Sequence, residues 1–219
     1  MKRKIGFVGC YSHDVILMLT RALGSMGKRV LLRDCNKQQT LHASVPVPEG
    51  MHMEWSVLEY DGFLFTGQET GSEETEDYEL EVVDFGMEGM AEELEKCTEL
   101  IVITDILLHH IRRLENIGIP KEKVKVCILR DSYENVSERE PEINDFLRCF
   151  PEKTVFFLPP DIRDVRNRYV CETLHEYNIN RASNEMQEVI FRLTGMVCTE
   201  NSEKEIRRCV KNRERRRYR

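Results

Sequence analysis

A glycine ends the first apolar run of the chain, at a position where proteins built from alternating strands and helices often bind phosphate. The run Lys4–Gly9 precedes a predicted helix, Ser12 is placed as its N-cap, and Asp14 falls in its first turn. Backbone N–H groups at such a strand–helix junction bind anions. The residue types that complete the loop therefore decide whether a nucleotide site is present.

The two common phosphate-binding patterns both fail here. A dinucleotide fingerprint starting at Gly9 requires glycine at positions 11 and 14, which are Tyr11 and Asp14. The pattern G-x-x-x-x-G-K-[ST] requires lysine and a hydroxyl residue at positions 15 and 16, which are Val15 and Ile16. No lysine in this loop offsets the Asp14 carboxylate, so the residues favour a capped helix over a phosphate site.

Thiols and imidazoles offer a second chemistry, but no local pattern selects a site. Cys171 and His175 are four residues apart, a spacing that would place both on one helix face. They could supply two ligands of a zinc site, but the sequence shows no second pair to complete it. His109 and His110 are adjacent, so they are expected to point in different directions. A Cys–His nucleophile remains open among eight cysteines and six histidines. We expect no metal site and packed roles for these residues.

Composition predicts one reduced, water-soluble domain. The 219 residues are 41% hydrophobic and 32% charged, and no run approaches the about 20 apolar residues of a membrane span. The apolar stretch after the basic N-terminus is too short for a signal peptide. The eight cysteines contain no Cys-x-x-Cys pair, which favours free thiols and a cytoplasmic location.

Charge is distributed unevenly along the chain. Residues 203–219 contain nine basic and three acidic side chains, a net charge of +6, which leaves −13 on the remaining residues. We therefore predict a domain over residues 1–200 and a basic tail over 201–219, either a short helix or a disordered arm. The tail is expected to contact an acidic protein surface, nucleic acid or an anionic membrane, or to be inert.

Six short apolar runs separated by helical spacing predict an α/β fold with a mostly parallel central sheet and helices on both faces. The helical spacing is clearest where Val15, Leu19 and Leu23 recur, and again from Ile106 to Ile117. The six runs are Lys4–Gly9, Arg29–Asp34, Leu80–Asp84, Leu100–Thr104, Val124–Leu129 and Val155–Leu158.

Residues 37–77 interrupt this alternation. Two apolar segments, Met53–Tyr60 and Phe63–Gln68, flank Asp61-Gly62, which is a strong two-residue hairpin signal. Seven carboxylates and no base lie between Glu69 and Glu81. We predict an inserted β-hairpin followed by an exposed acidic loop.

The ordered set of segments resembles the MinD/ParA family of deviant P-loop ATPases across most of residues 4–195. Residues 19–34 resemble the first helix and second strand of that family, and 77–86 resemble its Walker B strand, ended by Asp84. Residues 100–114 resemble its next strand–helix unit, and Phe156–Asp164 resembles its late element of an apolar strand, proline and aspartate. The resemblance implies a three-layer P-loop NTPase-like fold.

The departures from that family concern its catalytic residues. Active members carry two lysines and a threonine in the glycine loop, whereas the segment from Gly9 to Val15 is shorter and has none of them. The second acidic residue expected two positions after Asp34 is Asn36. The resemblance therefore implies a degenerate member in which Gly9, Ser12, Asp34 and Asp84 form a vestigial nucleotide site that binds neither ATP nor magnesium.

The function implied by the resemblance is that of a pseudo-ATPase acting as an interaction or scaffold module, with protein partners or a second copy of itself. The family context is that of TadZ/CpaE-like localisation factors of secretion and pilus machines. Two alternatives stay open. One is a nucleotide-binding switch with a remodelled loop that uses Asp84 for magnesium, and the other is an enzyme on a dinucleotide fold in which Asp34 holds a ribose.

Overall fold

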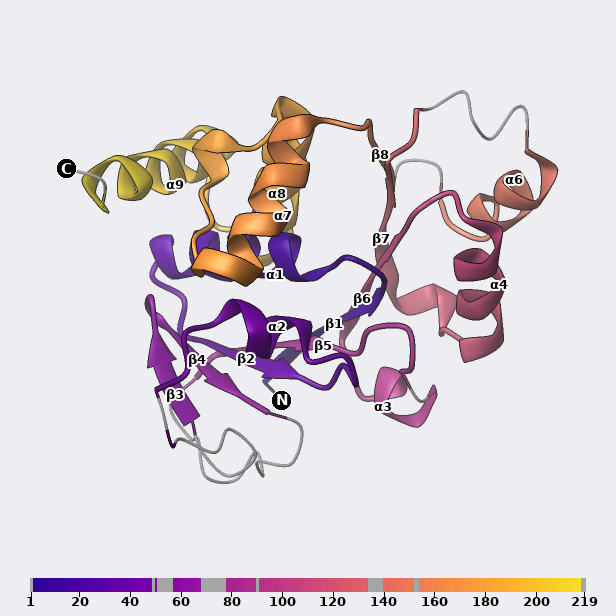
Figure 1. Cartoon of the computed structure of the whole chain (residues 1–219), viewed down its shortest axis with the longest axis horizontal. Helices are drawn as coiled ribbons and strands as arrows, with labels where there is room; N and C mark the ends of the chain where they lie inside the picture. Colours follow the sequence, from indigo (N-terminus) through magenta and orange to yellow (C-terminus); the bar gives the residue numbers. More distant parts are fainter. Residues whose placement is uncertain are drawn as a thin grey trace.

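All six predicted strands are present and lie in one sheet (Figure 1). The computed structural model describes residues 2–48, 50, 57–67, 78–89, 91–133, 140–151 and 154–217, with side chains up to residue 211. Within these residues the strand order is β3-β4-β2-β5-β1-β6-β7-β8, and every pairing except β3 with β4 is parallel. The predicted strands are β1 (Arg3–Gly9), β2 (Val30–Asp34), β5 (Leu80–Asp84), β6 (Glu99–Thr104), β7 (Val124–Arg130) and β8 (Val155–Leu158).

The predicted hairpin is confirmed and extends the sheet. Strands β3 (Val57–Tyr60) and β4 (Phe63–Thr66) are antiparallel, and β4 continues the sheet by pairing in parallel with β2. Asp61 and Gly62 have φ values of 50° and 86°, as the tight primed turns of hairpins require.

Most of the predicted acidic loop lies outside the described residues, as do residues 51–56 at the start of the hairpin segment. Its last member, Glu81, is not in an exposed loop. It lies within β5, is 7% exposed, and accepts a hydrogen bond from Nε of Arg33 on β2 at 2.8 Å. The Arg33 guanidinium explains why a carboxylate can be buried within β5, because a buried charge needs a charged partner.

Helices cover both faces of the sheet, giving the predicted three layers (Figure 1). One core cluster joins the sheet to α1, α8 and α9, and the other joins it to α3, α4 and α6. Val15, Leu19 and Leu23 of α1 are fully buried, as their spacing predicts. The helices are α1 (His13–Ser25), α2 (Thr40–Ser44), α3 (Ala91–Glu95), α4 (Leu108–Ile117), α6 (Pro141–Leu147), α7 (Ile162–Leu174), α8 (Asn184–Val197) and α9 (Glu203–Arg217), and the short 3₁₀ turns are Lys121–Lys123 and Ile179–Arg181.

The basic C-terminal segment forms the helix α9, which is the first of the two forms predicted for it, a short helix or a disordered arm. Ile206 and Val210 of α9 are 2% and 3% exposed and belong to the same core cluster as α1 and α8. Arg207 stacks over the ring of Phe191 with its guanidinium carbon 4.6 Å from the ring centre, and it pairs with Glu188 on α8. The first half of α9 therefore packs on the domain. No helix in the described part of the chain is long and apolar enough to cross a bilayer.

Candidate functional site

Only three residues, Cys10, Tyr11 and Ser12, connect the end of β1 at Gly9 to the start of α1. Gly9 has a φ of 135°, and a Cβ atom added there would lie 1.6 Å from the carbonyl oxygen of Ile103 on β6. The glycine is therefore required by close backbone packing between two strands. The loop is shorter than a phosphate-cradling loop, which places four residues between its glycines.

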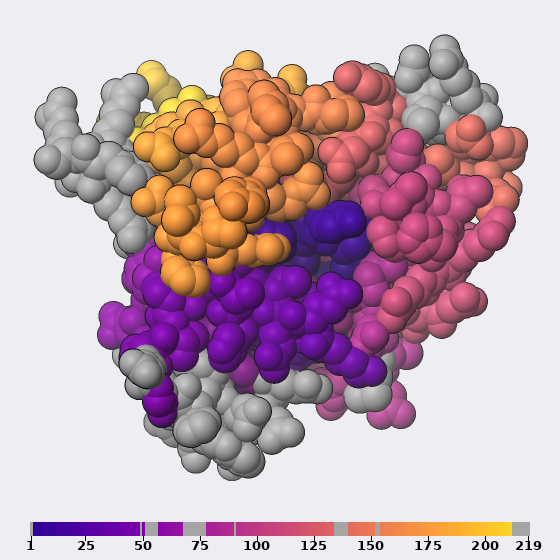
Figure 2. Space-filling model, in the orientation of Figure 1, coloured from indigo at the N-terminus to yellow at the C-terminus, as the bar shows by residue number. Residues whose placement is uncertain are grey.

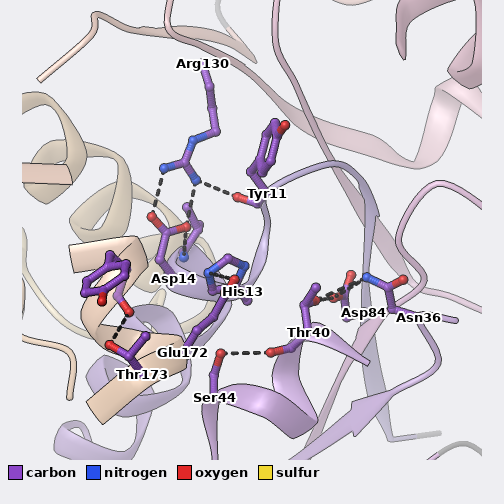
Figure 3. Close-up of polar contacts among 12 residues, drawn as sticks. Tyr11, His13, Asp14, Asn36, Thr40, Ser44, Asp84, Arg130, Glu172 and Thr173 are labelled. Carbon is purple, nitrogen blue, oxygen red and sulfur yellow. Dashed lines mark hydrogen bonds and ion pairs between the residues drawn. The ribbon is translucent and has the colours of Figure 1, made fainter. Parts of the chain in front are cut away.

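A buried ion pair occupies the start of α1 (Figure 3). The guanidinium of Arg130, at the end of β7, donates from its two terminal nitrogens to the two carboxylate oxygens of Asp14 at 2.7 and 2.8 Å. It also donates to the backbone oxygen of Tyr11 at 2.6 Å. Asp14 accepts the Val15 N–H at 2.8 Å, so a helix N-terminal donor that a phosphate would use is already paired.

The electrostatics of this pair are those of a charged, fully buried bridge. Asp14 is 0% exposed and Arg130 is 2% exposed. Burial alone would raise the pKa of Asp14, but the charge and hydrogen bonds of Arg130 more than offset it and hold that pKa below its ordinary value. The sequence placed Asp14 correctly in the first turn but did not identify its partner, which lies 116 residues away.

Ser12 occupies the N-cap position of α1, but its side chain does not cap the helix, which corrects the expectation from sequence. Its hydroxyl makes no hydrogen bond to the first turn. It donates instead to Oδ1 of Asp84 at 3.0 Å. The first loop and the end of β5, both assigned to the vestigial site, are therefore in direct contact.

Asp84 is fully buried and surrounded by donors. Its Oδ1 accepts from the Ser12 hydroxyl and from the Gly86 N–H, each at 3.0 Å. Its Oδ2 faces the Asn36 amide and the Thr40 hydroxyl, each at 3.4 Å (Figure 3). Burial raises the pKa of this carboxyl above its ordinary value despite these hydrogen bonds.

Asp34 lies beside Asp84 in the sheet, because the two residues are register partners at the ends of β2 and β5. One carboxylate oxygen accepts the Asn36 N–H at 3.0 Å and the other accepts the His42 N–H at 2.9 Å. Burial and then the neighbouring Asp84 charge raise the pKa of Asp34 to about 7. Both carboxylate oxygens accept hydrogen bonds from backbone N–H groups, which is typical of an aspartate with a structural role.

A Cys–His–Asp cluster lies on the same edge of the sheet and was not predicted. Cys10 follows β1 and Asp105 follows β6, which are neighbouring strands, and His110 lies in the first turn of α4. His110 Nδ1 is 3.7 Å from Cys10 Sγ and 2.8 Å from Asp105 Oδ1. Neighbouring parallel strands end at the same edge of a sheet, so the positions of Cys10 and Asp105 at two strand ends could have predicted that they lie close together.

The other predicted thiol and imidazole pairs need correction. His175 is not on the helix face of Cys171, because it ends α7 in the left-handed conformation with a φ of 52°, and Cys171 is fully buried. The rings of His109 and His110 are not directed apart as expected, since their centres lie 4.1 Å from each other. Only His110 of these four enters a described cluster of metal-ligating side chains.

Large apolar side chains are exposed at the carboxyl edge of the sheet. They follow four neighbouring strands, β1, β6, β7 and β8, whose parallel arrangement brings their C-terminal ends to one edge. Figure 2 shows the N-terminal residues, in indigo, on the floor of a hollow at this edge, between the purple, pink and orange segments. The edge patch consists of Tyr11, Leu107, Tyr133, Ile162, Val165 and Tyr169, each 45–79% exposed.

Solved structures with a similar fold include MinD and ParA proteins. A MinC:MinD cell division complex from Aquifex aeolicus matches with a TM-score of 0.60 and 12% identity over 91% of this chain and 97% of that one. A ParA family ATPase from Chlorobium tepidum matches with a TM-score of 0.57 and 16% identity over 87% of this chain and 97% of that one.

A third neighbour, pNOB8 ParA bound to nonspecific DNA, has a TM-score of 0.53 and 12% identity over 88% of this chain and 98% of that one. No protein-family model and no curated sequence matches the chain. At these identities the comparison confirms the expected MinD/ParA-like, P-loop NTPase-like fold.

Proposed function

We propose that this chain is a non-catalytic member of the MinD/ParA-like fold group, a cytoplasmic interaction module that retains the nucleotide-binding scaffold without phosphoryl transfer. The observation that carries this proposal is the ion pair between Asp14 and Arg130 at the start of α1. It places a carboxylate and a paired guanidinium where active proteins of this fold would bind phosphate.

Phosphoryl transfer depends on positioned positive charge around the transferred group. In this site the three-residue loop has no lysine. The guanidinium of Arg130 is within hydrogen-bond distance of both oxygens of Asp14 and the carbonyl of Tyr11, so it is committed to groups of the chain itself. A nucleotide would have to break this pair, and a buried pair is costly to break. These contacts support the proposed loss of ATP hydrolysis.

The edge patch supports a role in protein binding. Ile162, Val165 and Tyr169 follow one another at spacings of three and four residues on α7, so they form one solvent-facing stripe. Exposed apolar surface of this kind marks interaction sites more often than ordinary surface. We assign it to a protein partner or a second copy of the chain, within a localisation or assembly role of the TadZ/CpaE-like kind.

Oligomeric state in solution tests the second-copy form of this proposal. Light scattering after gel filtration should give a dimer for the wild-type chain and a monomer for the double variant Ile162→Ser/Tyr169→Ser. Leu174→Ser is the matched control, because Leu174 is also on α7 and 60% exposed but lies outside the patch. Dimers that persist in the double variant would exclude the stripe as the contact, and a wild-type monomer would assign the patch to a different protein.

A nucleotide-binding switch is the second candidate, and one observation favours it. Asp34 and Asp84 are neighbouring buried carboxyls with raised pKa values, and such groups gather at functional sites. A thermal-shift screen with ATP, ADP, NAD and FAD, with and without magnesium, separates it from the interaction module. The module predicts no shift, the switch a magnesium-dependent shift with ATP or ADP, and the dinucleotide enzyme a shift with NAD or FAD.

A further inference from the structure

Cys10, Asp105 and His110 bring three different ligand atoms together at the carboxyl edge of the sheet. The thiol sulfur, one carboxylate oxygen and the imidazole Nδ1 all lie within 4.8 Å of one another. The carboxylate is fixed, because the Leu107 N–H donates to the same Oδ1 at 2.9 Å. Asp105 is 5% exposed, while Cys10 and His110 are half-buried, so the cluster is both sheltered and reachable from solvent.

A catalytic relay does not explain this arrangement. In a nucleophile–histidine–carboxylate relay the carboxylate and the nucleophile contact opposite nitrogens of the imidazole. Here both approach the same atom, Nδ1 of His110.

The distances fit a shared metal ion. With zinc–sulfur and zinc–nitrogen bonds of about 2.3 and 2.05 Å, a tetrahedral site separates sulfur from nitrogen by about 3.6 Å. The observed separation of Cys10 Sγ from His110 Nδ1 is 3.7 Å. The same geometry separates nitrogen from oxygen by about 3.3 Å. His110 Nδ1 and Asp105 Oδ1 now form a hydrogen bond at 2.8 Å, so the ion would replace this bond and move the two atoms about 0.5 Å apart.

We propose that Cys10, Asp105 and His110 bind a thiophilic divalent cation, Zn²⁺, with one coordination position left for water or a partner's side chain. A donor set of sulfur, imidazole nitrogen and carboxylate oxygen is a zinc set and a poor match for Mg²⁺ or Ca²⁺, which take oxygen ligands. The ion replaces the thiol proton of Cys10, which is released on binding. It also displaces the Nδ1–H of His110 that now faces the Asp105 carboxylate, so the neutral imidazole carries its proton on Nε2 in the bound form. The site uses neither Asp34 nor Asp84.

Zinc at this position would link two loops that carry the edge patch. Tyr11 follows Cys10 directly, and its ring packs edge-on against His110 with centres 6.3 Å apart. Leu107 lies two residues after Asp105. Binding would therefore fix the orientation of both apolar side chains. The site stands on its own geometry and does not depend on the proposed function.

Metal titration of the full-length chain tests this proposal. Co²⁺ should give a thiolate-to-cobalt absorption band, and Zn²⁺ should bind at one ion per chain and raise the melting temperature. Cys10→Ser and His110→Gln should each weaken Zn²⁺ binding by more than the about 10–100-fold that loss of a supporting residue costs. Cys149→Ser and His42→Gln are the matched controls and should bind as the wild type does.

Thiol protection supplies a measurement that requires no variant to fold. In the wild-type chain Zn²⁺ should slow alkylation of Cys10 by iodoacetamide at least tenfold, while alkylation of the half-exposed Cys149 should be unchanged. Absence of stoichiometric Zn²⁺ binding, or equal alkylation of Cys10 with and without Zn²⁺, would overturn the site. Full retention of Co²⁺ absorption in Cys10→Ser would overturn it as well.

Discussion

Replacing Arg130 by methionine should strongly destabilise the protein. The substitution keeps much of the side-chain volume but removes the two donors that face Asp14 at 2.7 and 2.8 Å. Asp14 would remain fully buried with the Val15 N–H as its remaining hydrogen-bond donor. Leaving one member of a buried pair without its counter-charge costs about 3–5 kcal/mol. Urea unfolding followed by circular dichroism gives this free-energy change directly.

The exposed pair between Arg112 and Glu142 is the matched control. It is also bidentate, through Nε and one terminal nitrogen of Arg112 with contacts of 2.9–3.1 Å, but its side chains are 62% and 52% exposed. Arg112→Met should therefore cost at most about 1 kcal/mol. Comparable losses for Arg112→Met and Arg130→Met would refute the assignment of Arg130 to a buried, charge-paired site.

The double variant Asp14→Leu/Arg130→Met removes both charges and should recover most of the loss. Replacing a buried pair by apolar groups is often close to neutral, although the Tyr11 carbonyl loses a donor at a cost of about 1–3 kcal/mol. We expect a coupling energy of about 2 kcal/mol or more between the two positions. Additive losses would show that the two side chains do not interact as described.

Low pH should reduce the stability of the wild-type protein through the pair between Asp14 and Arg130. Because the pKa of Asp14 is lower in the folded chain than in the unfolded chain, its contribution is fully present above about pH 4. It is lost as pH falls through the lower, folded pKa. The double variant lacks this contribution, so its stability should fall less than that of the wild type over the same acid range.

Further predictions concern the remaining carboxyls and the C-terminal helix. Asp84→Asn should change the free energy of unfolding by about 1 kcal/mol and leave self-association unchanged. The pKa of Asp34 is about 7 in the folded chain, so its ionisation disfavours the fold between about pH 4 and 7. The wild type should therefore lose stability relative to Asp34→Asn as pH rises through this range. A difference in unfolding free energy that does not change with pH would contradict this. Truncation before Glu203 should cost about 3 kcal/mol or more in the free energy of unfolding, because Ile206 and Val210 are lost. Removing 212–219, which is rich in arginine, should reduce the salt dependence of any duplex DNA binding.

The sequence was most informative about structures that depend only on local residues. Each apolar run of the sheet could be predicted from its own residues, and the Asp61-Gly62 turn specifies its hairpin because both residues adopt positive φ. The resemblance to the MinD/ParA family grouped Asp34 and Asp84 in one site, and the two residues are register partners in β2 and β5.

Contacts between distant segments could not be predicted in this way. Ser12 was expected to cap α1, because N-caps are local, but its hydroxyl reaches Asp84 across 72 residues. A signal for Arg130 was available, since a charge that ends a buried strand needs a partner. The spacing of residues does not say which carboxylate provides it. The spacing from Ile106 to Ile117 predicted a helix but not the side chains that it buries. Ile111 and Leu114 of α4 are buried, whereas Leu107 at its N-cap is exposed, because the packing of a short helix is set by its neighbours.

Calorimetric titration of ATP with magnesium into the full-length chain tests the central claim most directly. A loop of three residues without lysine, beside a buried carboxylate, predicts no binding in the micromolar range and no phosphate release on prolonged incubation. Adding a lysine to the loop should not restore either activity, because the loop remains too short to surround a phosphate. Micromolar binding of ATP, together with hydrolysis that Asp84→Ala abolishes, would contradict the account.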